Sequence, residues 1–154
     1  MKPKFSLASL LVATALLLVG CNYDVPLTAR PTRNVDARLL GVWLGGDDGK
    51  GTLVVRQLDE GTYVVAMDHD LYTAFHSDFA GTAFLSVQEL NHDRLHTYLT
   101  ATLSADGRQL TVRTVSTKVV PESTKGRAAL QKLISANLAN PALYGEPAVF
   151  TRKK

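Results

Sequence analysis

Cysteine is almost absent from this sequence: Cys21 is the only one among 154 residues. An internal disulfide, a redox pair of thiols and a metal site built from several thiolates each need at least two cysteines, so all three are excluded. The folded part of the chain must therefore be stabilised by packing, without a covalent cross-link.

A strong excess of charge of one sign is also missing. The chain has 17 Lys and Arg against 14 Asp and Glu, and two of the basic residues, Lys2 and Lys4, lie in the first 20 residues. From Cys21 onward 15 basic residues stand against 14 acidic ones, a formal charge of +1. Nucleic-acid-binding proteins gather basic residues on one face, and without such a cluster we expect no nucleic-acid partner.

Recognisable catalytic and metal-binding motifs are lacking as well. The sequence has no G-x-S-x-G elbow, no H-E-x-x-H motif and no P-loop. His92 and His96 would lie about 13 Å apart if both belonged to one strand, too far to share a metal ion. His76 and Ser77 are neighbours in an expected strand and point to opposite faces. Residues 45–49 resemble a calcium loop in composition but not in spacing. We therefore expect no enzyme, no metal site and no cofactor.

The first 20 residues have the pattern of a secretion signal. Lys2 and Lys4 precede an apolar run from Leu7 to Val19, which is too short for a membrane-spanning helix of about 20 apolar residues. The run ends at Leu18-Val19-Gly20-Cys21, which resembles the lipobox of bacterial lipoproteins. The resemblance implies cleavage between Gly20 and Cys21 and attachment of diacylglycerol and fatty acyl groups such as palmitate to Cys21. An ordinary signal peptide with a chance cysteine is the alternative.

The same resemblance implies a location and a division of the chain. A protein lipidated at Cys21 is held to a membrane outside the cytoplasm, and Asn22 as the next residue favours the outer membrane, with the domain facing the periplasm. We expect a signal peptide at 1–20, a lipidated cysteine with a flexible, partly extended tether at 21–36, and one domain at 37–154.

From residue 37 onward the residues mostly alternate between apolar and polar, as in β-strands, and turns rich in Gly, Asp and Asn separate the runs. The expected strands span residues 39–44, 52–58, 62–67, 71–79, 82–90, 94–103, 109–119 and 148–151. The alternation is cleanest in the sixth run, where Leu95, Leu99 and Leu103 share one face while His96 and Tyr98 share the other. This pattern predicts one buried face and one face in water.

After Pro121 the spacing of apolar residues becomes helical. Ser123 or Thr124 can cap a helix over about 123–138, whose apolar stripe begins at Leu130. A meander of about eight strands has two edges to protect, and closing into a barrel protects both. We predict an all-β, mainly antiparallel fold: an up-and-down barrel, complete or incomplete, with the helix outside it or over one mouth. A two-sheet β-sandwich is the alternative.

Gly41-Val42-Trp43, in the first expected strand, resembles the G-x-W signature of lipocalins. A lipocalin barrel also has a helix before its last strand, and the chain resembles small bacterial lipoproteins with a lipocalin-like barrel. The resemblance implies that Trp43 packs across a closed barrel end and that the barrel binds a lipophilic molecule. Two family features have no clear match in the sequence: a Thr-Asp-Tyr motif and the arginine that covers the tryptophan.

These observations leave two hypotheses of function. In the first, a non-catalytic envelope lipoprotein binds a small apolar ligand, with Trp43, Leu95, Leu99 and Leu103 as candidate pocket wall. In the second, the barrel is solid and serves as a structural or protein-interaction module of the cell envelope. The expected partners are the membrane, through the lipid, and either an apolar small molecule or an envelope protein. The aromatic residues either fill the barrel or line its pocket: Tyr63, Tyr72, Phe75, Phe79, Phe84, Tyr98 and Phe150.

Overall fold

The computed structural model describes residues 22–45 and 50–154. The predicted signal peptide, its cleavage site at Gly20 and the lipidation site at Cys21 lie outside the described residues. Most of the glycine- and aspartate-rich turn after the first strand, residues 46–49, lies outside them too.

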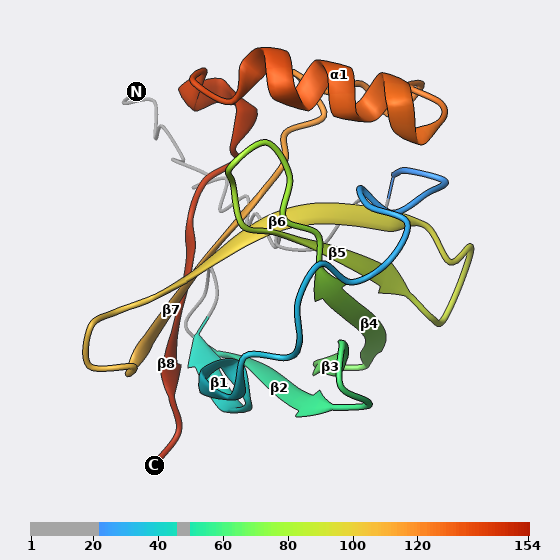
Figure 1. The fold of residues 1–154 in the computed structure, drawn as a ribbon. Helices are drawn as coiled ribbons and strands as arrows, with labels where there is room; N and C mark the ends of the chain where they lie inside the picture. The colour runs from blue at the N-terminus through green and yellow to red at the C-terminus, as the bar shows by residue number, and fades with distance from the viewer. Residues whose placement is uncertain (1–21, 46–49) are drawn as a thin grey trace, which may run out of the picture.

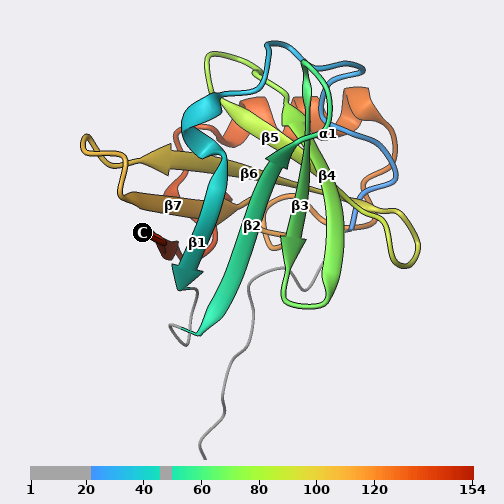
Figure 2. The same ribbon diagram turned by 90° about the horizontal axis from the view of Figure 1, so that it is seen from below.

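Eight antiparallel strands form a closed barrel in which each strand pairs with its neighbours in sequence and β8 pairs back with β1 (Figures 1 and 2). The strands are β1 (Gly41–Gly45), β2 (Gly51–Gln57), β3 (Thr62–Met67), β4 (Asp70–His76), β5 (Phe84–Glu89), β6 (His96–Leu103), β7 (Gln109–Thr114) and β8 (Ala148–Arg152). Closure places Trp43 of β1 opposite Arg152 of β8. The predicted up-and-down barrel is confirmed in its complete form, and the alternative of two separate sheets is wrong.

The strand expected at 109–119 ends earlier than its sequence pattern indicates. β7 ends at Thr114, and the chain leaves the barrel wall from Ser116 onward. The amide of Val115 donates to the Tyr98 carbonyl, and that of Ser116 donates to the Leu143 carbonyl. Val115 thus still pairs with β6 of the barrel, whereas Ser116 pairs with the layer outside it.

The helix α1 (Arg127–Asn137), the one α-helix of the described residues, lies against the outside of the barrel rather than over a mouth (Figure 1). It begins after the expected start at residue 123, because neither Ser123 nor Thr124 caps it. Gly126 occupies the N-cap position, with no side-chain hydrogen bond. Leu130 and Ile134 are the buried residues of its inner face. A short 3-10 helix, η2 (Pro141–Leu143), follows and leads into β8.

A second apolar core lies between α1 and the outer face of β5 and β6. Its buried residues come from six parts of the chain: Tyr23, Leu27, Phe84, Tyr98, Val115, Val120, Leu130, Ile134 and Leu143. Tyr98 is fully buried and stacks on Tyr23 with ring centroids 4.8 Å apart. The expectation that the outer face of the sixth strand is in water is therefore wrong for His96 and Tyr98. Alternation separates the two faces of a strand, but it does not say what packs on each.

The segment expected to be a flexible tether is part of this outer layer. Tyr23 and Leu27 are 1% and 0% exposed. The Leu27 amide donates to Ser86 Oγ over 3.0 Å, and the Tyr23 hydroxyl donates to the Val120 carbonyl over 2.7 Å. Within the described residues the segment from Asn22 therefore packs on the barrel. Its prolines and its lack of periodicity indicated an extended backbone, not where that backbone would lie.

Candidate ligand cavity

An apolar cavity of about 80 Å³ lies inside the barrel. Seven strands, β2 to β8, contribute to its wall, and every lining side chain is a hydrocarbon or thioether except that of Tyr72: Leu53, Val55, Val65, Met67, Tyr72, Val87, Leu99, Val112, Ala148 and Phe150. Such a space is small beside the roughly 300–1,000 Å³ of drug-sized ligand sites. By size and chemistry, it suits a compact apolar group or the end of a hydrocarbon chain.

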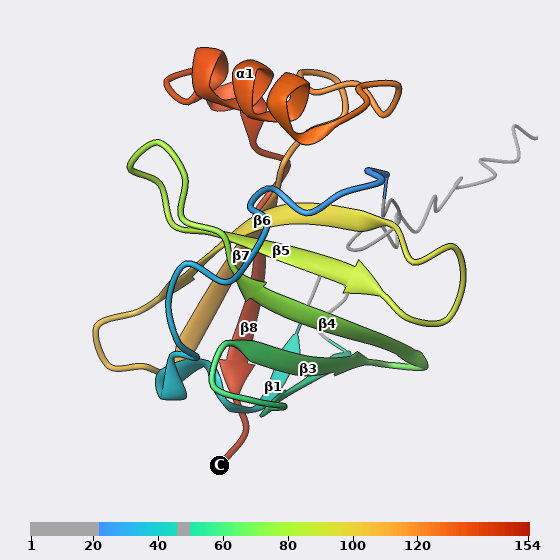
Figure 3. The same ribbon diagram turned by 45° about the vertical axis from the view of Figure 1, so that its right-hand side comes forward.

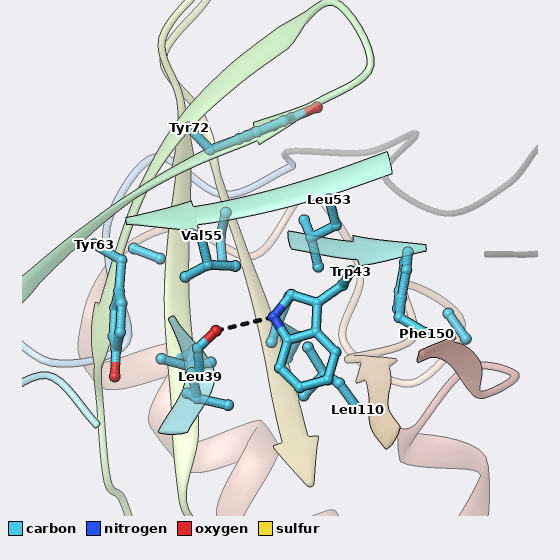
Figure 4. Packing of buried hydrophobic residues seen from close by; sticks show 13 residues of the cluster. Leu39, Trp43, Leu53, Val55, Tyr63, Tyr72, Leu110 and Phe150 are labelled. Atoms are coloured by element: carbon cyan, nitrogen blue, oxygen red, sulfur yellow. Dashed lines mark hydrogen bonds between the residues drawn. The ribbon is translucent and has the colours of Figure 1, made fainter. Parts of the chain in front are cut away.

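One end of the barrel, which we call the closed end, is filled by side chains. There the 3-10 helix η1 (Ala37–Leu39) turns beneath β1, and Leu39 packs with Trp43 and Leu110 (Figure 4). Trp43 is 0% exposed, and its indole N–H donates to the Leu39 carbonyl over 3.0 Å. This hydrogen bond satisfies a polar group that would be costly to bury alone.

Arg152 covers Trp43 from the last strand. Its guanidinium carbon lies 4.1 Å from the centre of the indole ring, a cation–π contact. The same guanidinium donates to the carbonyls of Leu40, Arg38 and Gly107. It thereby ties the start of the barrel to its last strand.

The sequence pattern shows no clear match for the arginine that covers the tryptophan in lipocalins. The structure places an arginine there. Gly41 of the G-x-W triplet makes room for it, because a Cβ at Gly41 would lie 2.8 Å from Arg152 Nη1. The backbone of Gly41 also has a φ of +142°, a value that residues other than glycine rarely adopt.

The cavity extends from the middle of the barrel toward its other end, which we call the open end. Met67 is the last residue of β3, and Ala148 is the first of β8. The β3–β4 turn and the β5–β6 loop lie at this end, while η1 and the C-terminus lie at the closed end (Figure 3). The packing of Trp43 thus closes the cavity on one side, and Met67 and Ala148 extend its wall toward the open end.

The four residues expected as pocket wall have different positions. Leu99 lines the cavity. Trp43 belongs to the same core but seals the closed end instead, and Leu103 packs against that core without lining the cavity. Leu95 precedes β6, is only half-buried and belongs to neither core. Of the four expected wall residues, Leu99 is thus the one that lines this cavity.

Most of the cavity wall was not singled out in the sequence. Val55, Val65 and Val112 are inward residues of β2, β3 and β7. The alternation of apolar and polar residues in those strands could have identified them as inward-facing. The aromatic residues divide between the two cores. Tyr63, Tyr72 and Phe150 belong to the barrel core, while Phe79, Phe84 and Tyr98 belong to the outer one.

His76 and Ser77 diverge, as neighbouring strand residues must. His76 Nε2 is hydrogen-bonded to the Tyr63 hydroxyl at 2.7 Å, whereas Ser77 Oγ is hydrogen-bonded to Thr28 and Ser86. Burial and, second, the charge of Arg33 lower the pKa of His76 below its ordinary value. The Tyr63 hydroxyl also accepts the Asp36 amide over 2.6 Å, so this group connects the barrel to the N-terminal segment.

His92 and His96 also have separate surroundings. His92 is exposed and pairs with Glu89, which raises its pKa, whereas burial lowers the pKa of His96. Within residues 22–45 and 50–154, no three His, Cys, Asp or Glu side chains are grouped to hold a metal ion.

Comparison with known proteins does not assign the chain to a family. The sequence matches no protein-family model, and comparisons with curated proteins and with solved structures find no match. No helix in the described parts of the chain has the length and apolar character needed to cross a bilayer.

Proposed function

We propose that this protein is a lipoprotein of the cell envelope, anchored through Cys21, whose barrel binds a small apolar ligand. The apolar cavity behind the open end carries the proposal, because a barrel used only as a solid support has no need of it. The lipobox-like Leu18-Val19-Gly20-Cys21 supports the anchor, and Asn22 supports the outer membrane as its location.

The proposed ligand is an apolar chain or a compact apolar molecule. The wall offers hydrocarbon surface on all sides, so burial of apolar area would drive binding. The arrangement supports binding rather than catalysis, because its wall brings no nucleophile, base or acid to the cavity except the Tyr72 hydroxyl.

A substitution inside the cavity tests ligand binding. Leu99→Trp places an indole in a space of about 80 Å³, so it should abolish binding of a fluorescent fatty-acid probe with little loss of stability. Thr102→Trp is the matched control, because Thr102 is exposed on the outer face of the same strand. If the wild-type domain ignores the probe and Leu99→Trp loses about 1–3 kcal/mol, as an overpacked core does, the binding proposal fails.

The anchor has its own test. Cys21→Ser in the full-length chain should abolish labelling by radioactive palmitate and release the protein from the membrane fraction. A variant that stays labelled and membrane-bound would show that Cys21 is not the attachment site.

The second candidate function is a protein-interaction module of the envelope. The observation that favours it is the exposure of large apolar side chains on the outside of the barrel, where Leu44, Leu71 and Val149 are each at least 40% exposed. Exposed apolar surface of this kind marks a contact surface for protein or membrane. Absence of probe binding, together with specific capture of an envelope protein that is lost in Leu44→Asp, would favour this candidate.

A further inference from the structure

The chain is hydrogen-bonded to the barrel from Asn22, the first residue that the structure describes. The amides of Asn22 and Tyr23 both donate to the His96 carbonyl, over 2.9 and 3.0 Å, and the His96 amide donates back to Tyr23. Cys21 is the residue directly before Asn22 in the sequence. A lipid on Cys21 would therefore hold the domain directly at the membrane surface.

The point of entry lies at the open end of the barrel. His96 is the first residue of β6, and β6 runs from the open end toward the closed end. The start of the described chain, the β3–β4 turn and the β5–β6 loop lie toward the right of Figure 3. The η1 helix and the C-terminus lie toward the lower left of the same view.

Three of the four large apolar side chains that are exposed among the described residues lie near the open end, and the fourth, Leu58, lies at the closed end. Leu44, Leu71 and Val149 are 41%, 40% and 44% exposed. Leu44 is the next-to-last residue of β1, and Leu71 and Val149 are the second residues of β4 and β8, so all three lie near the open end. Their cross-strand partners Thr52, Ala66 and Thr111 are uncharged. We call these three side chains the apolar collar.

We propose that the open end rests on the bilayer that carries the anchor, with the apolar collar in its interface, and that the ligand is the acyl chain of a lipid in that bilayer. This inference rests on the proposed anchoring at Cys21 and on the proposed use of the cavity. An anchor at the open end brings the cavity to the lipid, and the collar gives that end an affinity for the interfacial region. The chain end then enters the cavity from the bilayer without crossing water.

The charges near the open end indicate which bilayer it prefers. Among the described residues, five acidic side chains lie at this end: Asp68, Asp70, Glu89, Asp93 and Glu146. Three basic side chains lie there: Lys50, Arg94 and Arg113. A net negative end is repelled by anionic headgroups over about one Debye length. Docking should therefore be strongest on zwitterionic phospholipids and should weaken as anionic lipid is added at low salt.

A pair of tryptophan variants measures the orientation on the lipidated, full-length mature protein in phosphatidylcholine vesicles with brominated acyl chains. Leu71→Trp places the reporter in the collar, and Leu58→Trp places it in the β2–β3 turn at the closed end, where Leu58 is 60% exposed. Trp43 is fully buried and gives both variants the same background. Quenching should be at least about twofold greater for Leu71→Trp, because interfacial side chains lie 5–10 Å into the headgroup–acyl boundary. Equal or reversed quenching would overturn the orientation.

Insertion of a Gly/Ser linker of about 20 residues between Cys21 and Asn22 separates this inference from the function on which it rests. Such a linker spans about 25 Å and uncouples the open end from the anchor. Transfer of a fluorescent phospholipid from the vesicle to the protein should slow, while affinity for a fluorescent fatty acid in water should not change. If the original protein binds no fatty acid, the proposed function fails whatever the orientation. If it binds fatty acid but transfer is unaffected by the linker, direct entry from the bilayer fails alone.

Discussion

Replacing Trp43 with alanine is expected to lower the free energy of unfolding by about 3–5 kcal/mol, the range for truncation of a large buried aromatic residue. The ring is fully buried, so its removal leaves a cavity in the core. The Leu39 carbonyl also loses its hydrogen-bond donor, the indole N–H that lies 3.0 Å away. Arg152 loses the ring beneath its guanidinium. Because domains are commonly stable by only about 5–15 kcal/mol, the variant should be close to unfolding.

Urea titration of residues 22–154, followed by far-ultraviolet circular dichroism, measures this loss. Trp43→Phe is the control: it keeps an aromatic ring but not the hydrogen bond, so its loss should be about 1–2 kcal/mol. Arg152→Ala should cost about 0.5–2 kcal/mol, as cation–π contacts do. The double variant Trp43→Ala/Arg152→Ala should lose less than the two single losses together, because both remove the same contact. An unchanged midpoint for Trp43→Ala would refute the seal at the closed end, and strict additivity would refute the contact with Arg152.

Two further predictions concern the N-terminal segment and the buried histidines. Leu27 is 0% exposed, and Leu27→Ala should lower the free energy of unfolding by about 2–5 kcal/mol; an unchanged urea midpoint would place this segment outside the fold. The pKa of His76 is lowered in the folded protein, so below pH 6.5 the unfolded chain binds more protons and stability should fall as pH decreases. Urea titrations at several pH values should show a shallower fall for His76→Gln, not its loss, because the pKa of His96 is lowered too; a wild-type slope in the variant would contradict this origin.

The local elements could be predicted from local pattern. Period-two alternation and turn residues located all eight strands to within a few residues, except where β4 and β7 end early. Since sequential strands joined by tight turns pair as neighbours, their order followed as well. The identification of Trp43 as a buried residue needed only its place in the first strand.

The contacts that complete the closed end join distant parts of the sequence. Arg152 covers Trp43 although 108 residues lie between them. An arginine near a chain end usually has a solvated side chain, and only barrel closure, which pairs β1 with β8, brings it over the indole ring. The same contact also explains the glycine at position 41, because a Cβ there would collide with the Arg152 guanidinium.

What the sequence by itself determined is the set of strands, their order and the inward face of each, because alternation and turn chemistry act between near neighbours in the chain. Tertiary structure alone decided three further features: that Tyr23 and Leu27 are buried, that Tyr98 is covered by a second layer, and that a cavity remains beside Leu99. Each depends on how side chains from separate elements fill a shared volume. The same inward residues produce a solid or a hollow barrel according to how closely the opposite walls approach one another.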